Sequence, residues 1–447
     1  MNSSVAIKGI FLVAVAVGLT VALHSVSNLV FERMMRQSEV DGEIATMFAA
    51  PQTVIGPVIV ARLRETWHEK YRSHNDKWIE EKRYEEHVHA FFPDTLKYST
   101  TMTVEERALG IFKTPVYFTD GRMEGTISVP SLNKFKRREG SSIQVTESKI
   151  MLTVSDIRGF TSAPKITWKE TEIALDGISG HSSLNSAIPL SMDGTNGAVD
   201  FSIDIKLHGV ISLFVAPVAG ENNVDILGSW PHPGFKGEFL PITRNITEKG
   251  FKAHWHVSGI ATNTQANVRS LIEKSSDFIG ASQTFGVELI RPQNPYSLTD
   301  RAVKYGFLFI ALTFASFFLF ETQSGLRIHP IQYGFVGLAQ SVFFLLLLSL
   351  SEHTGFGVSY LVATAGVVIS ITYYLVRALK GWKRGGAFGF GLAMVYGMLF
   401  VIMQSEDHAL LIGSALLFIV LSLAMAKTRD VDWYNLPDRG EEEKAVA

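Results

Sequence analysis

Six long apolar stretches without a charged residue at their centres constrain this chain more than any other feature. About 20 mostly apolar residues are needed to cross the hydrocarbon core of a bilayer, so each stretch is predicted to span a membrane. The stretches are residues 9–30, 303–320, 331–350, 356–376, 387–403 and 409–426. Between the first two, charge density and polar turns are those of a domain in water, so the overall hydrophobic content of 47% averages two environments.

The first stretch has the layout of either a signal peptide or an uncleaved anchor, with Lys8 just before it. A signal peptide needs small residues at the cleavage site that follows its apolar core. Leu23 and His24 stand where those small residues are needed. The sequence therefore favours an uncleaved N-terminal transmembrane anchor.

Lysine and arginine in the short loops predict the orientation. Loops on the cytoplasmic side carry the excess of these residues. They occur after the second, fourth and sixth stretches, at Arg327, at Arg377, Lys380, Lys383 and Arg384, and at Lys427 and Arg429. The alternate loops, 351–356 and 404–408, contain neither residue. Both termini are therefore expected in the cytoplasm, and residues 32–300 on the outer side.

The outer domain is predicted to be rich in β-structure. Several runs alternate apolar and polar residues between Gly- and Pro-containing turns, which is typical of half-buried strands. The runs are residues 53–63, 142–157, 165–178, 198–217 and 251–260. Many short strands with frequent turns indicate a β-sandwich, or a pair of such units.

Helices are expected to be minor in this domain. Residues 38–50 are predicted to continue the anchor helix, and residues 263–276 to form another. The highly charged residues 64–86 are interpreted as a solvated loop or a helical hairpin.

The predicted fold class is an α+β membrane protein with four parts. These are a transmembrane anchor (1–31), a sandwich-like β-rich outer domain (32–300), a bundle of five transmembrane helices (301–427) and a cytoplasmic tail (428–447).

Composition excludes several classes of function. A formal net charge of -2 gives no reason to expect nucleic acid, which needs a concentrated basic face. The absence of cysteine excludes disulfides, thiolate catalysis and iron–sulfur clusters. The sequence has no Walker A loop, HExxH, GxSxG or GxGxxG motif, so no cofactor is expected and an enzyme is not the favoured class.

Two histidine pairs are the candidates for a metal site. His87 and His89, and likewise His254 and His256, are two residues apart, so on a strand each pair shares a face. The simpler interpretation is that they are polar residues on the solvated face of a sheet, and no metal is predicted.

The two outer loops between predicted spans carry acidic and imidazole groups. We expect Glu352 and His353 from one loop, and Glu406, Asp407 and His408 from the other, to form a candidate polar cluster on the outer face of the membrane. Such a cluster would bind a cation, shuttle protons or dock the outer domain. The alternative is helix capping by Ser351 and Ser405, with acids near the next helix N-terminus.

A Pro- and aromatic-containing segment, residues 229–235, is the candidate partner loop. Its Trp230, His232 and Phe235 either recognise a partner or form an ordinary structural corner. Gly385 and Gly389 in the fifth span, with Gly386, Gly391 and Gly397, predict close helix packing within the membrane.

Longer motifs resemble one bacterial family. Three C-terminal motifs are similar to the CreD family of inner-membrane proteins: HPIQYGFVGLAQSVFFLLLLSLSEHTGF at 329–356, LLIGSALLF at 410–418 and the DWY ending at 432–434. The resemblance extends upstream through five more motifs: PQTVIGPVIV at 51–60, SDIRGF at 155–160, SWPHPGFKGEFLP at 229–241, GFKAHW at 250–255 and RAVKYGFLFIALTF at 301–314. It implies an inner-membrane protein with a periplasmic domain that is linked to cell-envelope integrity. It implies no catalytic residue, ligand or cofactor.

The expected function is therefore non-catalytic support of the envelope by binding an envelope protein or component, with the lipid bilayer as an obligatory partner. One alternative is a lipid or small-molecule transporter. An ion-coupled carrier is disfavoured because the mid-span positions are almost wholly apolar, apart from residues such as Gln340 and Ser341. The other alternative is a periplasmic enzyme of unknown type. The oligomeric state is not predicted.

Overall fold

The computed structural model describes residues 3–72, 77–128, 130–175, 177–179, 183–188, 198–274, 283–291, 294–324, 329–379, 381–405 and 409–429. It divides into two compact units, and we describe each by itself. Unit 1 comprises Met1–Gln37 and Gln293–Ala447, and unit 2 comprises Ser38–Pro292.

Unit 1 is built from long helices. The helices of the chain are α1 (Ser3–Met47), α2 (Thr264–Lys274), α3 (Pro295–Ser324), α4 (Pro330–Thr354), α5 (Phe356–Ala378), α6 (Trp382–Gln404) and α7 (Ala409–Thr428). Over the described residues, four helices are long and apolar enough to cross a membrane: α1 from Ala14 onward, α4, α5 and α6. The predicted stretches 303–320 and 409–426 form α3 and α7, but neither is among these four candidate spans.

Glycines let the helices of unit 1 approach closely. A Cβ on Gly389 of α6 would lie 2.1 Å from Thr372 Oγ1 of α5, and one on Gly385 would lie 2.6 Å from the backbone nitrogen of Val376. This confirms the packing role predicted for these two glycines. The prediction is wrong for Gly386, Gly391 and Gly397, since a Cβ there would meet nothing within 4 Å.

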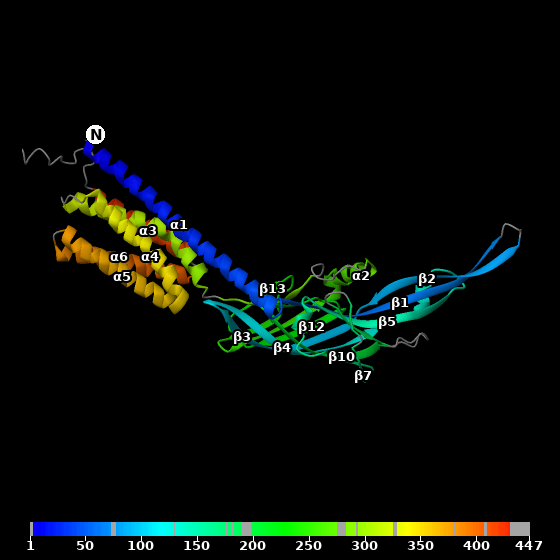
Figure 1. The fold of residues 1–447 in the computed structure, drawn as a ribbon. Helices are drawn as coiled ribbons and strands as arrows, with labels where there is room; N and C mark the ends of the chain where they lie inside the picture. The colour runs from blue at the N-terminus through cyan, green and yellow to red at the C-terminus, as the bar shows by residue number, and fades with distance from the viewer. Residues whose placement is uncertain are drawn as a thin grey trace, which may run out of the picture. The chain divides into compact units, whose positions relative to one another are not determined.

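Unit 2 contains two eight-stranded sheets (Figure 1). The strands are β1 (Gln52–Arg72), β2 (Trp78–Phe91), β3 (Thr95–Leu109), β4 (Phe112–Ser128), β5 (Ser142–Val154), β6 (Lys165–Trp168), β7 (Thr171–Ile173), β8 (Gly177–Ser179), β9 (Ser183–Ala187), β10 (Ala198–Val210), β11 (Ser212–Val215), β12 (Glu221–Gly228), β13 (Pro233–Gly237), β14 (Thr243–Thr247), β15 (Gly250–Ser258) and β16 (Phe285–Leu289). Sheet A has the order β13-β16-β11-β1-β5-β9-β8, with β2 also paired to β1. Sheet B has the order β14-β15-β12-β3-β4-β10-β6-β7.

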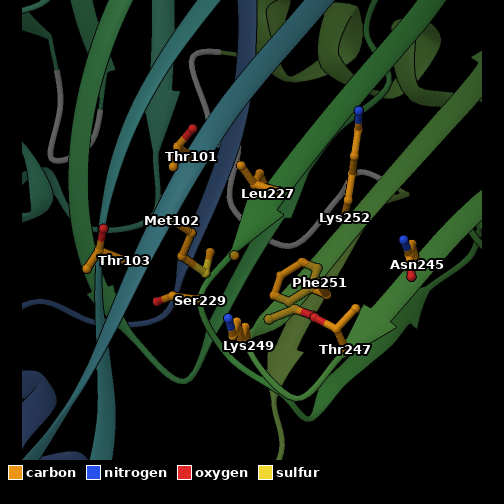
Figure 2. A pocket seen from close by; sticks show the side chains of 12 residues that line it. Thr101, Met102, Thr103, Leu227, Ser229, Asn245, Thr247, Lys249, Phe251 and Lys252 are labelled. Atoms are coloured by element: carbon orange, nitrogen blue, oxygen red, sulfur yellow. The ribbon is translucent and has the colours of Figure 1, made fainter.

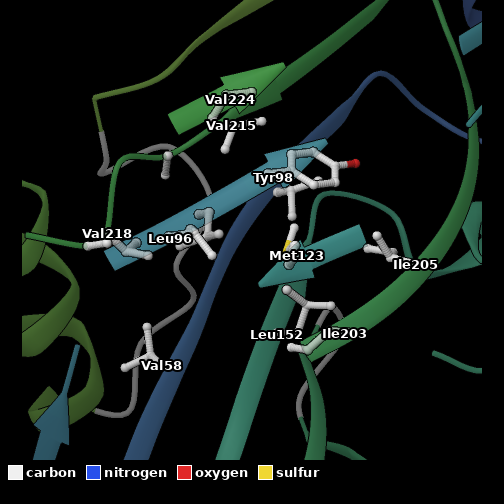
Figure 3. Packing of buried hydrophobic residues seen from close by; sticks show 14 of the residues in the cluster. Val58, Leu96, Tyr98, Met123, Leu152, Ile203, Ile205, Val215, Val218 and Val224 are labelled. Atoms are coloured by element: carbon white, nitrogen blue, oxygen red, sulfur yellow. The ribbon is translucent and has the colours of Figure 1, made fainter. Parts of the chain in front are cut away.

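The two sheets share one hydrophobic core. Strands of both alternate buried and exposed residues, as β10 does with its pattern from Val199 to Leu207. Figure 3 shows Leu152 of sheet A near Met123 and Ile203 of sheet B, and Val58 of sheet A belongs to the same cluster of buried residues. The sandwich-like arrangement expected from the alternating runs is therefore present in unit 2.

Two runs that were predicted as single strands are broken. Residues 165–178 turn sharply at Lys169 and Glu170, whose φ angles are 48° and 67°, and the short hairpin β6–β7 results. Residues 198–217 break at Ile211, whose φ is 65°. Before Ile211 the chain belongs to sheet B as β10, and after it to sheet A as β11. Local alternation does not reveal such a change of sheet.

The prediction of a loop or helical hairpin at residues 64–86 is wrong. Strands β1 and β2 pair over 14 residue pairs, from Ile59↔Phe91 to Arg72↔Trp78. On its other edge, β1 pairs with β5 only up to the pair Thr66↔Ser142. Residues 67–72 and 78–84, here called the distal arm, therefore form a two-stranded ribbon, which Figure 1 shows extending beyond the other strands of unit 2. Both faces of the ribbon meet water, so its residues are charged on both faces and lack the period-2 signal of a half-buried strand.

Candidate functional site

Glu352, from the predicted outer cluster, lies at the centre of a polar network in unit 1. Its Oε1 is 3.4 Å from Nε of Arg33 in α1 and accepts a hydrogen bond of 3.3 Å from the hydroxyl of Tyr296 in α3. The Glu352 side chain is only 10% exposed. The network therefore joins α1 to the start of α3 and the end of α4, three segments that are distant in the sequence.

The position of Glu352 explains why it needs these partners. It lies in the last turn of α4, where the helix dipole disfavours a negative charge. Arg33 supplies the compensating positive charge, and Tyr296 supplies a donor. Burial, together with the charge of Glu352, raises the pKa of Tyr296 to about 12, so its hydroxyl keeps its proton. Arg33 and Tyr296 were missed in the sequence, although both flank predicted spans.

The other members of the predicted cluster divide into two groups. His353 is exposed in the same turn of α4. Glu406, Asp407 and His408 lie outside the described residues, so the predicted convergence of the two loops stays a prediction. The capping alternative is wrong for Ser351, because its hydroxyl donates back to Leu348 O at 2.8 Å within α4.

A second network, which we call the clasp, joins the first and last residues of unit 2. Arg291, just after β16, makes a two-pronged ion pair with Asp41 of α1, at 2.6 and 3.0 Å. Asp41 also accepts a hydrogen bond of 2.6 Å from the Thr114 hydroxyl of β4, and Arg291 donates to Lys113 O at 2.7 Å. The two charged side chains are only 14% and 24% exposed. Sequence reasoning missed the clasp because its two charges are 250 residues apart.

Two of the three side chains named in the candidate partner loop pack against the core of unit 2. Trp230 donates to Ile290 O at 2.9 Å, and its ring packs against the hydrophobic core. Phe235 meets Trp255 edge-on at a centroid distance of 5.7 Å. His232 is the exposed side chain of the three. Trp230 and Phe235 therefore have structural contacts, and their part in recognising a partner stays a prediction.

The histidine pairs have protein partners. His254 lies 3.0 Å from Asp225, and His256 lies 3.3 Å from Glu221 on the same neighbouring strand, β12. Burial lowers the pKa of His89, and the neighbouring His87 lowers it further. Among the described residues, no group of three or more His, Cys, Asp or Glu side chains is placed to hold a metal ion.

A buried carboxylate anchors the base of the distal arm. Glu65 of β1 is fully buried and accepts hydrogen bonds from the backbone nitrogens of Arg137 and Arg138, at 3.0 and 2.9 Å, and from the Ser141 hydroxyl. Burial acts to raise the pKa of Glu65, but these hydrogen bonds and the charge of Arg138 outweigh it and hold the pKa below its ordinary value. Arg138 also stacks on the Trp67 ring, 3.5 Å from its centroid.

Long apolar helices in one unit and a two-sheet polar domain in the other define an integral membrane protein with a large extramembrane domain. The family model described as "Inner membrane protein CreD" matches residues 4–434. The chain is also similar to Inner membrane protein CreD of Escherichia coli (strain K12), with 32% identity over 421 residues, 93% of this chain and 91% of the relative. The chain therefore belongs to the CreD family of inner membrane proteins, as its motifs predict.

Solved structures give only a weak likeness. A mutant M1 zinc metallopeptidase from Deinococcus radiodurans matches with a TM-score of 0.22 and 6% identity, over 37% of this chain and 38% of that one. Another structure of this peptidase from the same organism gives a TM-score of 0.21 and 5% identity. A likeness at this level carries no argument about fold or activity.

Proposed function

We propose that this inner membrane protein supports cell-envelope integrity by binding an envelope partner through its β-rich domain, without catalysis. In this proposal residues 1–31 are the anchor, 32–300 the periplasmic domain, 301–427 a five-helix membrane bundle and 428–447 a cytoplasmic tail. Both termini then lie in the cytoplasm. Membership of the CreD family and the alternating charge of the short loops support this arrangement.

The observation that carries the binding role is the distal arm. Tyr71, Trp78, Ile79 and Tyr84 are 41%, 71%, 41% and 65% exposed on a ribbon of only two strands. An isolated two-stranded ribbon has little stability of its own in water, and large exposed aromatic side chains are typical of interface hot spots. A partner that covers the arm would bury these side chains and stabilise the ribbon.

An ion-coupled carrier and an enzyme have less support from the described residues. Within unit 1, the buried Gln340 donates to the Thr313 hydroxyl at 2.7 Å, a contact between α4 and α3 that suits helix packing. Two hollows in unit 2 are open to solvent, and neither gathers histidines with carboxylates as an acid–base site does. These observations favour a binding protein over an ion-coupled carrier or an enzyme.

In-cell photocrosslinking tests the proposal. A photoreactive residue is placed singly at Trp78 and Tyr84 of the arm, at His232 of the partner loop and at Glu352. Ile260 is the control, because it is 98% exposed in unit 2 but lies outside the arm. Crosslinked products are identified by mass spectrometry.

The expected result is a specific crosslink to an envelope protein or cell-wall component from Trp78 and Tyr84, and none from Ile260. Crosslinks from the arm to lipid alone would support the lipid-transporter alternative. Equal labelling at the arm and at Ile260 would reject the arm as a binding surface.

A further inference from the structure

A hollow on sheet B has features of a ligand site that the proposed partner binding does not use. It lies where β3 and β12 meet the β14–β15 hairpin, and its volume is about 510 Å³. Figure 2 shows the side chains of Leu227 and Phe251 between those of Thr101 and Asn245. The volume is within the range of sites for small molecules, about 300–1,000 Å³.

Two glycines allow close packing in the wall of the hollow. A Cβ on Gly228 would lie 2.2 Å from the Phe251 ring, and one on Gly250 would lie 2.1 Å from Gly228 O. The φ of Gly250 is +146°, which side chains other than glycine rarely adopt. The two strands and the Phe251 ring therefore approach closely, which a side chain at either glycine would prevent.

Hydrogen bonds hold the walls of the hollow in place. Ser229 accepts a hydrogen bond of 2.9 Å from the Val104 nitrogen and donates from its own backbone to Met102 O at 3.0 Å. On the opposite side, Thr247 donates to Gly250 O at 3.0 Å. The hollow is thus formed by bonded strand ends before any ligand arrives.

The residues that line the hollow select for negative charge. They include Lys249 and Lys252 and no acidic residue, and their other polar groups are hydroxyls and an amide. Apolar surface is supplied by Leu227, which is 50% exposed although it lies within a strand.

A second hollow on the same sheet has the opposite charge. Its volume is about 410 Å³, and it is lined by Glu124, Glu170 and Asp200 and by no lysine or arginine. Charges of the two signs are therefore separated between the two hollows. Because both hollows lie on one sheet, the acidic hollow serves as an internal comparison for the basic one.

We propose that the hollow at Lys249 and Lys252 binds an anionic ligand with a short apolar part. A phosphate or carboxylate group contacts a lysine ammonium group and the surrounding hydroxyls, and a hydrocarbon segment covers Leu227. Phospholipids and water-soluble organic phosphates both have this chemistry. The site is independent of the distal arm, so either proposal can fail without the other.

The test uses the full-length protein, purified in dodecyl maltoside, and isothermal titration calorimetry. The probes are dihexanoyl phosphatidic acid, glycerol 3-phosphate, inorganic phosphate and dihexanoyl phosphatidylcholine. Dihexanoyl phosphatidic acid is expected to bind, and the double variant Lys249→Gln/Lys252→Gln to weaken its binding by about tenfold or more, as the loss of charged hydrogen bonds predicts. The matched control Lys165→Gln/Lys206→Gln, which removes two charges elsewhere on sheet B, is expected to stay within about twofold of the parent protein.

A third variant tests the apolar part of the proposal. Leu227→Ser is expected to weaken dihexanoyl phosphatidic acid more than glycerol 3-phosphate, because only the lipid has acyl chains to lose contact with this side chain. Tighter binding of the lipid than of glycerol 3-phosphate identifies a lipid source, and the reverse identifies a soluble one. Equal affinity for phosphatidylcholine, or unchanged affinity in the double lysine variant, overturns the anionic site. If inorganic phosphate binds as tightly as either organic probe, the apolar part of the proposal is overturned.

Discussion

The clasp between Asp41 and Arg291 is expected to be among the strongest single polar contributions to the stability of unit 2. Removing one partner of a fully buried ion pair costs about 3–5 kcal/mol, and a fully exposed pair contributes about 0–1 kcal/mol. The clasp side chains are 14% and 24% exposed, and Thr114 and Lys113 O make further hydrogen bonds with them. We therefore expect Asp41→Asn to lower the free energy of unfolding by about 2–3 kcal/mol.

A double-mutant cycle measures the clasp directly. Asp41→Asn, Arg291→Gln and the double variant are unfolded with urea as full-length protein in detergent, and tryptophan fluorescence follows unit 2 through the buried Trp255. With an m-value of about 3 kcal/mol/M, a loss of about 2.5 kcal/mol lowers the urea midpoint by about 0.8 M. The coupling energy of the pair is expected to be about 1.5 kcal/mol.

An exposed ion pair provides the comparison. Arg107 and Glu105 lie 3.1 Å apart with side chains 55% and 52% exposed, and their coupling is expected to stay below about 0.5 kcal/mol. If the clasp couples no more strongly than this control, then its burial and two-pronged geometry do not stabilise unit 2, and the reasoning is refuted.

Two further predictions concern the arm base and the helix packing. Glu65→Gln is expected to destabilise unit 2 by about 2 kcal/mol at pH 7, because a charged acceptor of three hydrogen bonds is lost. Since folding lowers the pKa of Glu65, this advantage is complete above its ordinary value of 4.5 and is lost as the pH falls through the folded value, so urea midpoints of the two proteins should converge in acid. Gly389→Leu is expected to lower the midpoint of thermal unfolding in detergent by several degrees, because its side chain would overlap Thr372. Gly391→Leu, at a position with nothing within 4 Å, should leave that midpoint nearly unchanged, and equal effects of the two substitutions would contradict the packing assignment.

The strands of unit 2 show how far alternation alone can predict this fold. It located β10 and β15 because one face of each meets the common core and the other is more exposed. It also located β1 and β5, although residues 54–59 of β1 and 150–154 of β5 are buried without alternation. It failed for the distal arm, where both faces are solvated and cross-strand contacts such as the 2.8 Å ion pair between Arg83 and Glu69 replace a buried face. It also missed the break at Ile211, because both halves of that run face the same core from different sheets.

The candidate site was predicted only in part, for a related reason. Glu352 was noticed from its place between two apolar stretches, but Arg33 and Tyr296 were not, since no local pattern connects α1 and α3 with the end of α4. The hollow at Lys249 and Lys252 was missed as well, because its lining residues come from strands β3, β12, β14 and β15, and β3 is distant from the others in the sequence.

Reading the sequence alone was enough to predict a membrane protein of the CreD family with a β-rich domain between apolar segments. Both conclusions rest on local properties: the length of an apolar run that a bilayer requires, and motifs read along the chain. Which polar groups meet is known only from the fold, as for Asp41 and Arg291, which are 250 residues apart in the sequence. A charge close to the end of a helix or strand has many possible partners in the sequence, and the packing of distant elements brings one of them within hydrogen-bonding distance.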